Sequence, residues 1–241
     1  MKSVSVIIPT YNDEKILDVK IVTLLNKLNR TKLKYEIILI NDGSKDKTLK
    51  IIEKFKKKNK NILLLNNKIN VGKSCSIRKG LKKAKYEHII LIDSDLPYFN
   101  VFNKVVKKLK ENFDFVFINR RHKKSSIKNK NLNLYQISRY LIGYFVSLII
   151  RFLLTLNIYG GDTQSGLKGF KKVKNFNKLN FISNKFFLDL EIMYYYKNMN
   201  MKFYSIPVKY NIDDKSSIKF LSIKKNFDIL FELVKVINKL K

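Results

Sequence analysis

The chain has 241 residues, with 50 Lys and Arg against 19 Asp and Glu, which gives a formal net charge of +31. Its 45% of hydrophobic residues can fill the core of one large domain, with or without a small appendage. Its single cysteine, Cys75, excludes an internal disulfide and fits a reducing compartment. The first residues, MKSVSVIIPTYN, lack a signal-peptide pattern because their apolar run is short, so we expect a cytoplasmic protein.

The positive charge alone does not indicate a nucleic-acid-binding protein. Most of the basic residues are Lys, they are spread over nearly every segment, and Asn, Ile, Phe and Tyr are also abundant. A+T-rich codons encode this mixture, so we expect no nucleic-acid partner. The same charge would attract the protein to anionic lipid headgroups, by about 1 kcal/mol per basic residue near the surface.

The first part of the chain alternates short apolar runs with segments of helical periodicity. The apolar runs predict strands at 3–9, 35–42, 61–66 and 88–93, and the periodic segments predict helices at 14–28, 46–58 and 74–85. Strands and helices that alternate in this way predict an α/β fold with a mostly parallel sheet and helices on both faces.

Polar side chains follow three of these strands, at 9–12, 41–44 and 93–95. Ligands bind at the carboxyl ends of strands in such sheets. The stretch Asp93-Ser94-Asp95 places two carboxylates one residue apart in a chain that has few of them. Such a pair is either an ordinary surface turn or a divalent cation site that holds a phosphate-bearing ligand. Three polar strand ends at one edge favour the cation site.

The loop NVGKSCSIRKG (70–80) places Gly72 and Lys73 at the start of a predicted helix. A helix N-terminus with a nearby lysine is a good place for phosphate. The spacing of its glycines is not that of a Walker loop, and a plain helix start is the alternative.

The second half of the chain is predicted to contain strands at 113–121 and 202–210 and a polar, basic loop at 122–133. The segment 134–158 is apolar over a length that could span a membrane, but Arg151 interrupts it at a cost of about 2.5 kcal/mol or more. We therefore expect a helix half buried in the domain and half in the lipid interface, with a spanning helix as the less favoured alternative.

The remaining segments are a polar loop at 160–170, a helix at 186–196 and a basic amphipathic helix at 220–241. Asp189 and Glu191 point to different sides of their helix, so at most one of them is expected to face a site. The last helix either docks on the domain or lies on a membrane. We expect a catalytic domain at 1–215, followed by the amphipathic helix at 216–241.

Six stretches, in this order and spacing, carry a resemblance to a known family: VSVIIPTYND, INDGSKDKT, NVGKSCSIRKG, LIDSDLP, GDTQSGLKGF, and FFLDLEIMYYY with IPVKY and SSIK after it. They resemble family 2 glycosyltransferases of the GT-A fold, and most of all the polyprenyl-phosphate sugar transferases, such as dolichyl-phosphate glucosyltransferase and mannosyltransferase. The Gly-Lys and Asp-Thr-Gln stretches favour the glucosyl branch.

The resemblance implies a nucleotide-sugar site and a metal site. The residues at matching positions of the nucleotide-sugar site are Pro9, Tyr11, Asp13, Glu14, Asp42, Lys73, Arg78, Asp93 and Ser94. Either Asp13 or Glu14 stands for the family's acidic contact. Asp93 and Asp95 match the metal-binding Asp-x-Asp, which implies Mg²⁺ or Mn²⁺. Pro97 stands where some members have a further metal ligand.

On the acceptor side, the resemblance implies Arg120, Arg139 and Asp162 as catalytic residues beside Asp95. Arg139, Gln164 and Lys219 would contact the acceptor phosphate. A divalent cation would neutralise the charge of the departing diphosphate. A lipid phosphate is already an anion and needs no strong general base, so basic residues would hold and align it.

The expected function is inverting transfer of a hexose, from UDP-glucose or next GDP-mannose, to a polyprenyl or dolichyl phosphate. We expect the enzyme on the inner face of the cytoplasmic membrane, with a separate membrane protein as a further partner. One alternative is a family 2 enzyme that acts on a polysaccharide or other glycan. A nucleotidyltransferase would need a glycine-rich basic signature near the N-terminus, which this sequence lacks. A non-catalytic, basic membrane-binding module is the most distant alternative.

Overall fold

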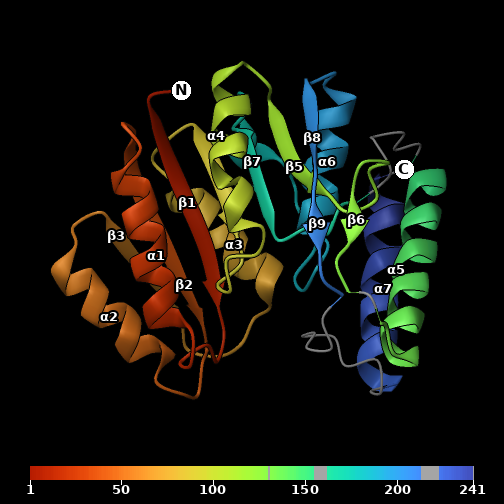
Figure 1. Cartoon of the computed structure of the whole chain (residues 1–241), viewed down its shortest axis with the longest axis horizontal. Coiled ribbons are helices and arrows are strands. Elements are labelled where there is room, and N and C mark those ends of the chain that lie inside the picture. The colour runs from red at the N-terminus through yellow and green to blue at the C-terminus, as the bar shows by residue number, and fades with distance from the viewer. Residues whose placement is uncertain (130, 155–161, 213–222, 241) are drawn as a thin grey trace.

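The computed structural model describes residues 1–129, 131–154, 162–212 and 223–240, without the side chains of Arg139, Leu153 and 223–227 (Figure 1). A seven-stranded sheet with the order β3-β2-β1-β4-β7-β5-β8 lies at its centre. Its strands are β1 (Ser3–Thr10), β2 (Lys34–Asp42), β3 (Ile62–Asn67), β4 (His88–Ile92), β5 (Phe115–Asn119), β7 (Leu167–Lys171) and β8 (Phe203–Pro207). Only β7 runs antiparallel to its neighbours in this sheet, so the predicted mostly parallel sheet is confirmed.

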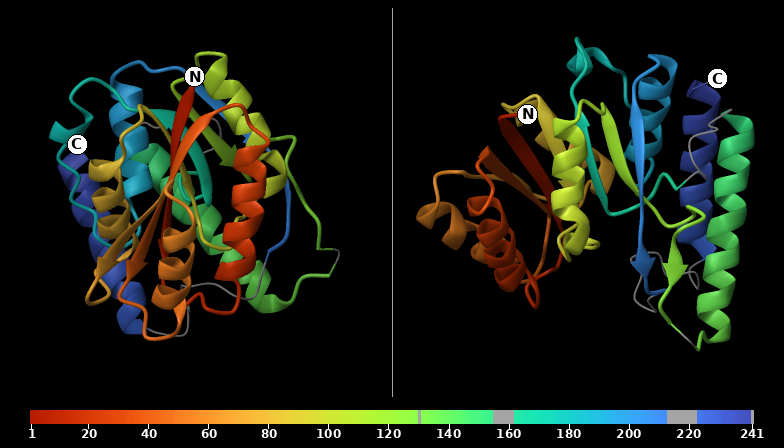
Figure 2. Two further views of the ribbon diagram at one scale, coloured as in Figure 1. Left: turned by 90° about the vertical axis from the view of Figure 1, so that its left-hand side faces the viewer. Right: turned by 45° about the horizontal axis from the view of Figure 1, so that its top comes forward.

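Helices cover both faces of the sheet, as predicted (Figures 1 and 2). The helices are α1 (Leu17–Asn29), α2 (Thr48–Lys58), α3 (Lys73–Lys83), α4 (Phe102–Lys110), α5 (Leu134–Leu153), α6 (Leu188–Asn198) and α7 (Ile223–Leu240). Successive strand residues point to opposite faces. In β1, Val6 and Ile8 join the core beneath α1, α2 and α4, whereas Ile7 joins the core beneath α3, α6 and α7.

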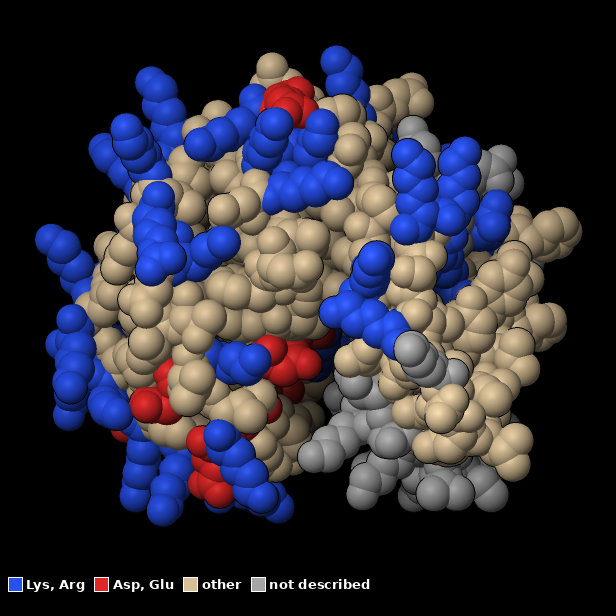
Figure 3. Space-filling view, in the orientation of Figure 1, with Lys and Arg blue, Asp and Glu red and all other residues tan. Residues whose placement is uncertain are grey.

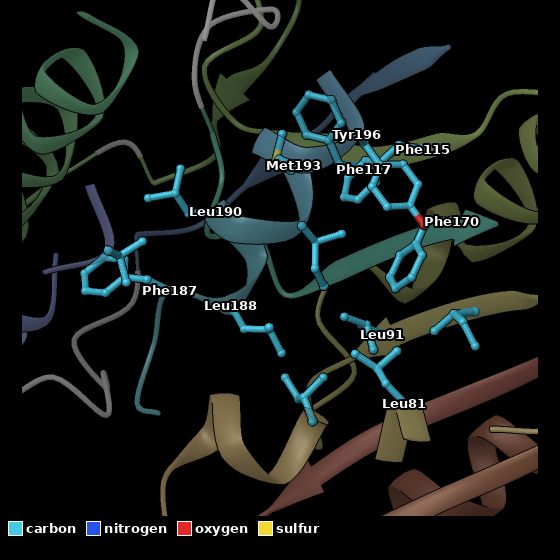
Figure 4. Close-up of a cluster of buried hydrophobic side chains, with 14 of the residues drawn as sticks. Leu81, Leu91, Phe115, Phe117, Phe170, Phe187, Leu188, Leu190, Met193 and Tyr196 are labelled. Carbon is cyan, nitrogen blue, oxygen red and sulfur yellow. The ribbon is translucent and has the colours of Figure 1, made fainter. Parts of the chain in front are cut away.

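An aromatic cluster joins β5, β7 and α6 in the second of these cores (Figure 4). Phe115 stacks on Phe170 with ring centroids 5.6 Å apart, and Tyr196 meets the two rings edge-on at 5.5 and 5.7 Å. The Tyr196 hydroxyl donates a 2.6 Å hydrogen bond to the Lys171 carbonyl, so the polar end of this buried ring has a partner. The cluster fixes β7, and with it the residues just before β7, which lie at the site described below.

The prediction of a loop over 160–170 was wrong for its last residues, because 167–170 belong to β7. The strand is short, and Gly169 in its middle weakens its sequence signal. That glycine lets α4 approach closely, since a Cβ at this position would lie 2.7 Å from Val105 Cγ1.

The structure also divides or adds several elements. The strand predicted over 202–210 splits into β8 and β9 (Lys209–Tyr210), and β9 pairs with β6 (Ser126–Ile127) in the segment predicted to be a loop. Two short 3-10 helices are η1 (Phe99–Val101) and η2 (Phe176–Lys178).

Helices α5 and α7 form one side of the molecule (Figure 1). The inner face of α7 is buried through Leu233, Val236, Ile237 and Leu240, so this helix docks on the domain. Much of α5 is exposed and apolar: Phe145 is 64% exposed and Phe152 is 84% exposed. Among the described residues, no helix combines the length and apolar character needed to cross a membrane. Residues 155–158 of the predicted apolar helix lie outside the described part.

Candidate functional site

A cavity of about 810 Å³ opens where β1, β2 and β4 end. Its walls come from the residues after these strands, the glycine loop before α3, the loop before α6 and the first turns of α7. Among the predicted site residues, the cavity brings together Pro9, Tyr11, Asp13, Asp42, Lys73, Asp93, Ser94 and Asp95. In Figure 3, Lys and Arg are scattered over the surface, whereas most of the visible Asp and Glu lie in the lower half of the view, some of them at the edge of a hollow.

Of the two acidic residues that follow β1, Asp13 faces the cavity and Glu14 does not. Asp13 Oδ2 accepts a 3.1 Å hydrogen bond from the Tyr11 amide, while Glu14 Oε2 accepts one of 3.0 Å from the Lys47 amide at the start of α2. Burial raises the pKa of Asp13, and a hydrogen bond from Ser94 offsets only part of this effect. Of the two residues, Asp13 is therefore the better candidate for contact with a ligand in the cavity. Glu14 instead connects the segment after β1 to the start of α2.

Asp42 holds the glycine loop in place through hydrogen bonds to its backbone. Its buried carboxylate accepts hydrogen bonds from the Asn67 side chain and from the Val71 and Gly72 amides, each 3.0 Å long. Gly72 has a φ of +97°, which favours glycine, and a Cβ there would lie 2.4 Å from the Asn184 carbonyl oxygen.

The N-terminus of α3 already has partners inside the protein. The amides of Ser74 and Cys75 donate to the carbonyls of Lys185 and Asn184, at 3.1 and 3.0 Å. The first amides of a helix are free to bind a phosphate only when they have no other partner, and two of them are already bonded here. The backbone at this position is therefore that of a plain helix start. Lys73 supplies the charged side chain that this loop brings to the cavity, beside Asn70, Val71 and Gly72.

The carboxylates after β4 lie beside that lysine. Lys73 Nζ is 2.6 Å from Asp93 Oδ1. Burial lowers the pKa of Lys73, but the charges of Asp93 and Asp189 outweigh it and leave the pKa raised. Asp95 keeps an exposed surface, but the protein around it removes part of its solvent, and this effect, followed by the charge of Asp93, raises the pKa of Asp95.

The Asp-x-Asp residues fit a divalent cation. Two neighbouring carboxylates repel each other, and a cation would relieve this repulsion. Mg²⁺ is commonly held by one or two carboxylates together with substrate phosphates, so a pair of carboxylates is sufficient for this mode. Gly166 leaves space for the first carboxylate, since a Cβ there would lie 2.8 Å from Asp93 Oδ2.

A buried ion pair stands near this site, and sequence reasoning did not identify it. Lys168 on β7 donates to Asp189 Oδ2 at 2.9 Å, and the Lys168 side chain is only 2% exposed. The same ammonium bonds the Ser165 carbonyl, and the buried Ser165 hydroxyl has no partner among the described residues. Lys168 lies among the buried residues of β7, and a lysine within a short buried strand indicates a buried charge. This indication could not be used because 160–170 was expected to be a loop.

Arg120 and Asp162 form a second ion pair, in which the Asp162 side chain is 2% exposed and the Arg120 side chain 33%. Arg120 donates to the Asp162 carboxylate through Nε, Nη2 and its backbone amide, each at 2.8 Å. Burial raises the pKa of Asp162, but the charge and hydrogen bonds of Arg120 outweigh it and leave the pKa lowered. Gln164 is exposed close by in sequence. The Arg139 side chain and Lys219 lie outside the described part.

Arg78 does not reach the 810 Å³ cavity, contrary to its predicted place in the nucleotide-sugar site. It lies one helical turn beyond Lys73 and donates to the Phe181 carbonyl and to Asn184 Oδ1. It lines a separate cavity of about 410 Å³ together with Lys79 and Lys82. Its position on α3 turns it toward the loop before α6 and away from the strand ends.

Arg121, which follows Arg120, was noted in the sequence only as the end of a strand. Its Nη2 donates to the Gly143 carbonyl on α5, and its Cζ lies 5.2 Å from the centre of the Tyr144 ring. Its Nε and Nη1 are buried, and neither has a partner among the described residues. Burial is the largest cause of its lowered pKa. A bound anion would satisfy these two nitrogens.

The comparisons with known proteins agree along most of the chain. The model of the family described as Glycosyl transferase family 2 matches residues 5–210. Dolichyl-phosphate beta-glucosyltransferase ALG5A of Trichomonas vaginalis is 30% identical over 236 residues, which cover 92% of this chain and 69% of that protein. Dolichyl-phosphate beta-glucosyltransferase of Dictyostelium discoideum is 31% identical over 232 residues, 89% of this chain and 68% of that protein.

Solved structures share the fold at low sequence identity. One of them is glucosyl-3-phosphoglycerate synthase from Mycobacterium tuberculosis in complex with Mn²⁺, UDP-glucose and phosphoglyceric acid. It matches this protein with a TM-score of 0.64 at 12% sequence identity, and the match covers 98% of this chain and 80% of that one. This likeness confirms the expected GT-A fold.

Proposed function

Because the chain belongs to glycosyl transferase family 2 and is a glycosyltransferase, we propose that it moves a hexose from a nucleotide-diphosphate sugar to a polyprenyl or dolichyl phosphate. UDP-glucose is the first candidate donor and GDP-mannose the second, and the reaction inverts the sugar carbon. The observation that carries this proposal is the similarity to dolichyl-phosphate beta-glucosyltransferases over nine-tenths of the chain.

The donor would occupy the cavity at the strand ends. Its nucleotide would lie near Pro9, Tyr11 and Asp13, and its diphosphate near Lys73 and the Asp-x-Asp turn. Asp93 and Asp95 would hold Mg²⁺ or Mn²⁺, which supplies positive charge for the departing diphosphate. Lys73, now paired with Asp93, would be free to turn to a phosphate oxygen once that carboxylate has another partner.

The acceptor phosphate would lie on the side of Arg120, Arg121 and α5. The two nitrogens of Arg121 that have no partner among the described residues suit phosphate oxygens, and the adjoining exposed face of α5 suits a hydrocarbon chain. The ion pair with Asp162 would keep Arg120 fixed beside this phosphate. Arg139, Gln164 and Lys219 are further candidates on this side, as the family resemblance implies.

The enzyme would work at a membrane surface, because its acceptor is a lipid. The exposed apolar residues of α5 would enter the interface, and the surface lysines would attract anionic headgroups. We propose a peripheral position on the inner face of the cytoplasmic membrane, with a separate membrane protein as a further partner.

The test is transfer of label from a panel of radioactive nucleotide sugars to undecaprenyl phosphate in detergent, with Mg²⁺ or Mn²⁺, in the wild type and in Asp95→Ala. We expect label from one donor in the organic phase, and its loss in the variant. Metal-dependent donor hydrolysis without a lipid product would replace the lipid acceptor with a glycan one. No response to any donor would overturn the proposal.

A further inference from the structure

We propose that Glu232 on α7 is a positioning residue for the nucleotide-sugar site, so that the C-terminal helix completes this site. The inference rests on the proposed function for the identity of the ligand. Its structural part concerns the loop 183–187 between η2 and α6, which forms one wall of the cavity.

Glu232 accepts hydrogen bonds from several consecutive groups of this loop. Its Oε1 lies 2.7 Å from the Asn184 amide, 2.7 Å from the Lys185 amide and 3.2 Å from the Ser183 hydroxyl. Its Oε2 lies 3.2 Å from the Phe186 amide. Successive amides that converge in this way form a concave site for an anion. In this protein the anion is the carboxylate of Glu232, which lies 46 residues after Phe186 in the sequence.

The same loop holds the glycine loop through its carbonyls. The Asn184 and Lys185 carbonyls accept the Cys75 and Ser74 amides at the start of α3, and the Asn184 carbonyl lies against Gly72. Lys73, between Gly72 and Ser74, carries the ammonium that contacts Asp93. The amides of the loop are therefore fixed by Glu232, while its carbonyls fix the residues that position Lys73.

The helix also contributes to the cavity directly. Asp228 and Ile229, about one turn before Glu232, line the cavity beside Lys185 and Phe186. Asp228 Oδ2 is 2.9 Å from Lys185 Nζ. The buried face of α7, with Val236 at 1% exposure, anchors the helix in the core. Loss of the Glu232 carboxylate should thus loosen the loop while the helix stays docked.

The experiment compares Glu232→Gln with the wild type, and with Glu53→Gln as a control that makes the same charge change at an exposed position of α2. Calorimetry with UDP-glucose and Mn²⁺ should show a Kd about tenfold higher in Glu232→Gln. The free energy of a hydrogen bond to a charged acceptor corresponds to a change in Kd of about this size. The KM for the donor should rise, while kcat and the KM for the lipid phosphate stay within about twofold of the wild-type values.

Hydrogen exchange supplies a readout that needs no substrate. The amides of 184–186 and 74–75 should exchange faster in Glu232→Gln and unchanged in Glu53→Gln. Wild-type exchange at these amides, or donor binding within twofold of the wild type, would overturn the inference. Failure of the wild type to bind any donor would overturn the proposed function alone, because the exchange result stands apart. If Glu232→Gln does not fold, Glu232→Asp keeps the charge, lacks the reach and gives the same test.

Discussion

Two ion pairs with a buried carboxylate, Arg120–Asp162 and Lys168–Asp189, join residues from different parts of the sequence. Asp162 lies on the segment before β7, and its partner Arg120 follows β5. Removal of one member of such a pair leaves an uncompensated charge in a poorly solvated place. The consequences for stability and for its pH dependence can be worked out from the direction of the pKa shift.

Arg120→Met should destabilise the fold by about 3–5 kcal/mol at pH 7, because Asp162 is then a buried carboxylate without its cation. In the wild type the pKa of Asp162 is lowered, so the stability that it contributes is present above its unfolded-state pKa and is lost only as the pH falls through the folded value. In the variant the charge and side-chain hydrogen bonds of Arg120 are lost, so burial, the largest influence on this pKa, is opposed only by the backbone amide of residue 120 and the charge of Lys168, and the pKa rises. The variant should therefore regain stability as the pH falls from 7 toward 4.

Urea unfolding at several pH values, followed by circular dichroism, measures this effect. The double variant Arg120→Met/Asp162→Asn is the control, since it has no carboxylate at position 162 to titrate. It should recover much of the lost stability at pH 7 and lack the pH dependence. A single variant that tracks the wild type at every pH would contradict the role assigned to the pair.

Gly166→Ala tests the space beside the Asp-x-Asp turn. The added Cβ would lie 2.6 Å from Pro97 Cγ and 2.8 Å from Asp93 Oδ2, so the carboxylate must move. Mn²⁺ binding, followed by electron paramagnetic resonance, should weaken about tenfold or more, with a smaller change in thermal stability. Gly143→Ala on α5 is the matched control for metal binding, because its Cβ meets only Arg121 Nη2 at 3.6 Å. Equal Mn²⁺ affinity in both variants would show that the turn does not need this glycine.

At the scale of elements, local sequence patterns were sufficient for the first half of the fold. The strands β2 and β4, which lead to Asp42 and Asp93, contain continuous apolar runs, and the helices α1 and α2 have clear periodicity. β7 could not be predicted, because its antiparallel place between β4 and β5 is decided by distant partners. The Lys168–Asp189 pair was missed for the same reason, and so was the contact of Glu232 with the loop before α6.

Helix α5 carries a prediction of its own. Replacing Leu141, Phe145 and Phe152 together with Ser should leave the fold intact, since these side chains are 57%, 64% and 84% exposed. Flotation with vesicles should show a loss of membrane binding, because each large apolar side chain contributes about 1.5–3 kcal/mol when buried. Val19→Ser with Ile69→Ser is the control, with residues 67% and 71% exposed away from α5. Equal flotation of the two variants would remove α5 from the membrane contact.

At the scale of the whole molecule, the net charge of +31 and the five Asp residues that line the cavity, Asp13, Asp42, Asp93, Asp95 and Asp228, are separate electrostatic features. Lys and Arg are scattered over the face shown in Figure 3, so a broad anionic surface suits them better than a single narrow ligand. Such long-range attraction is weakened by salt, since the Debye length falls from about 10 Å at 0.1 M to about 3 Å at 1 M. Contacts within the partly buried cavity at the strand ends are screened less.

Binding to vesicles that contain anionic lipid should therefore fall by more than tenfold between 0.1 and 1 M NaCl, while binding to neutral vesicles stays weak and nearly constant. Donor binding in detergent should change by only a few-fold over the same range, because the carboxylates and Lys73 act at short distance. Sedimentation with the two kinds of vesicle, alongside calorimetry with UDP-glucose, separates these effects. Salt-independent vesicle binding would assign the membrane contact to the apolar face of α5 alone and leave the surface lysines without that role.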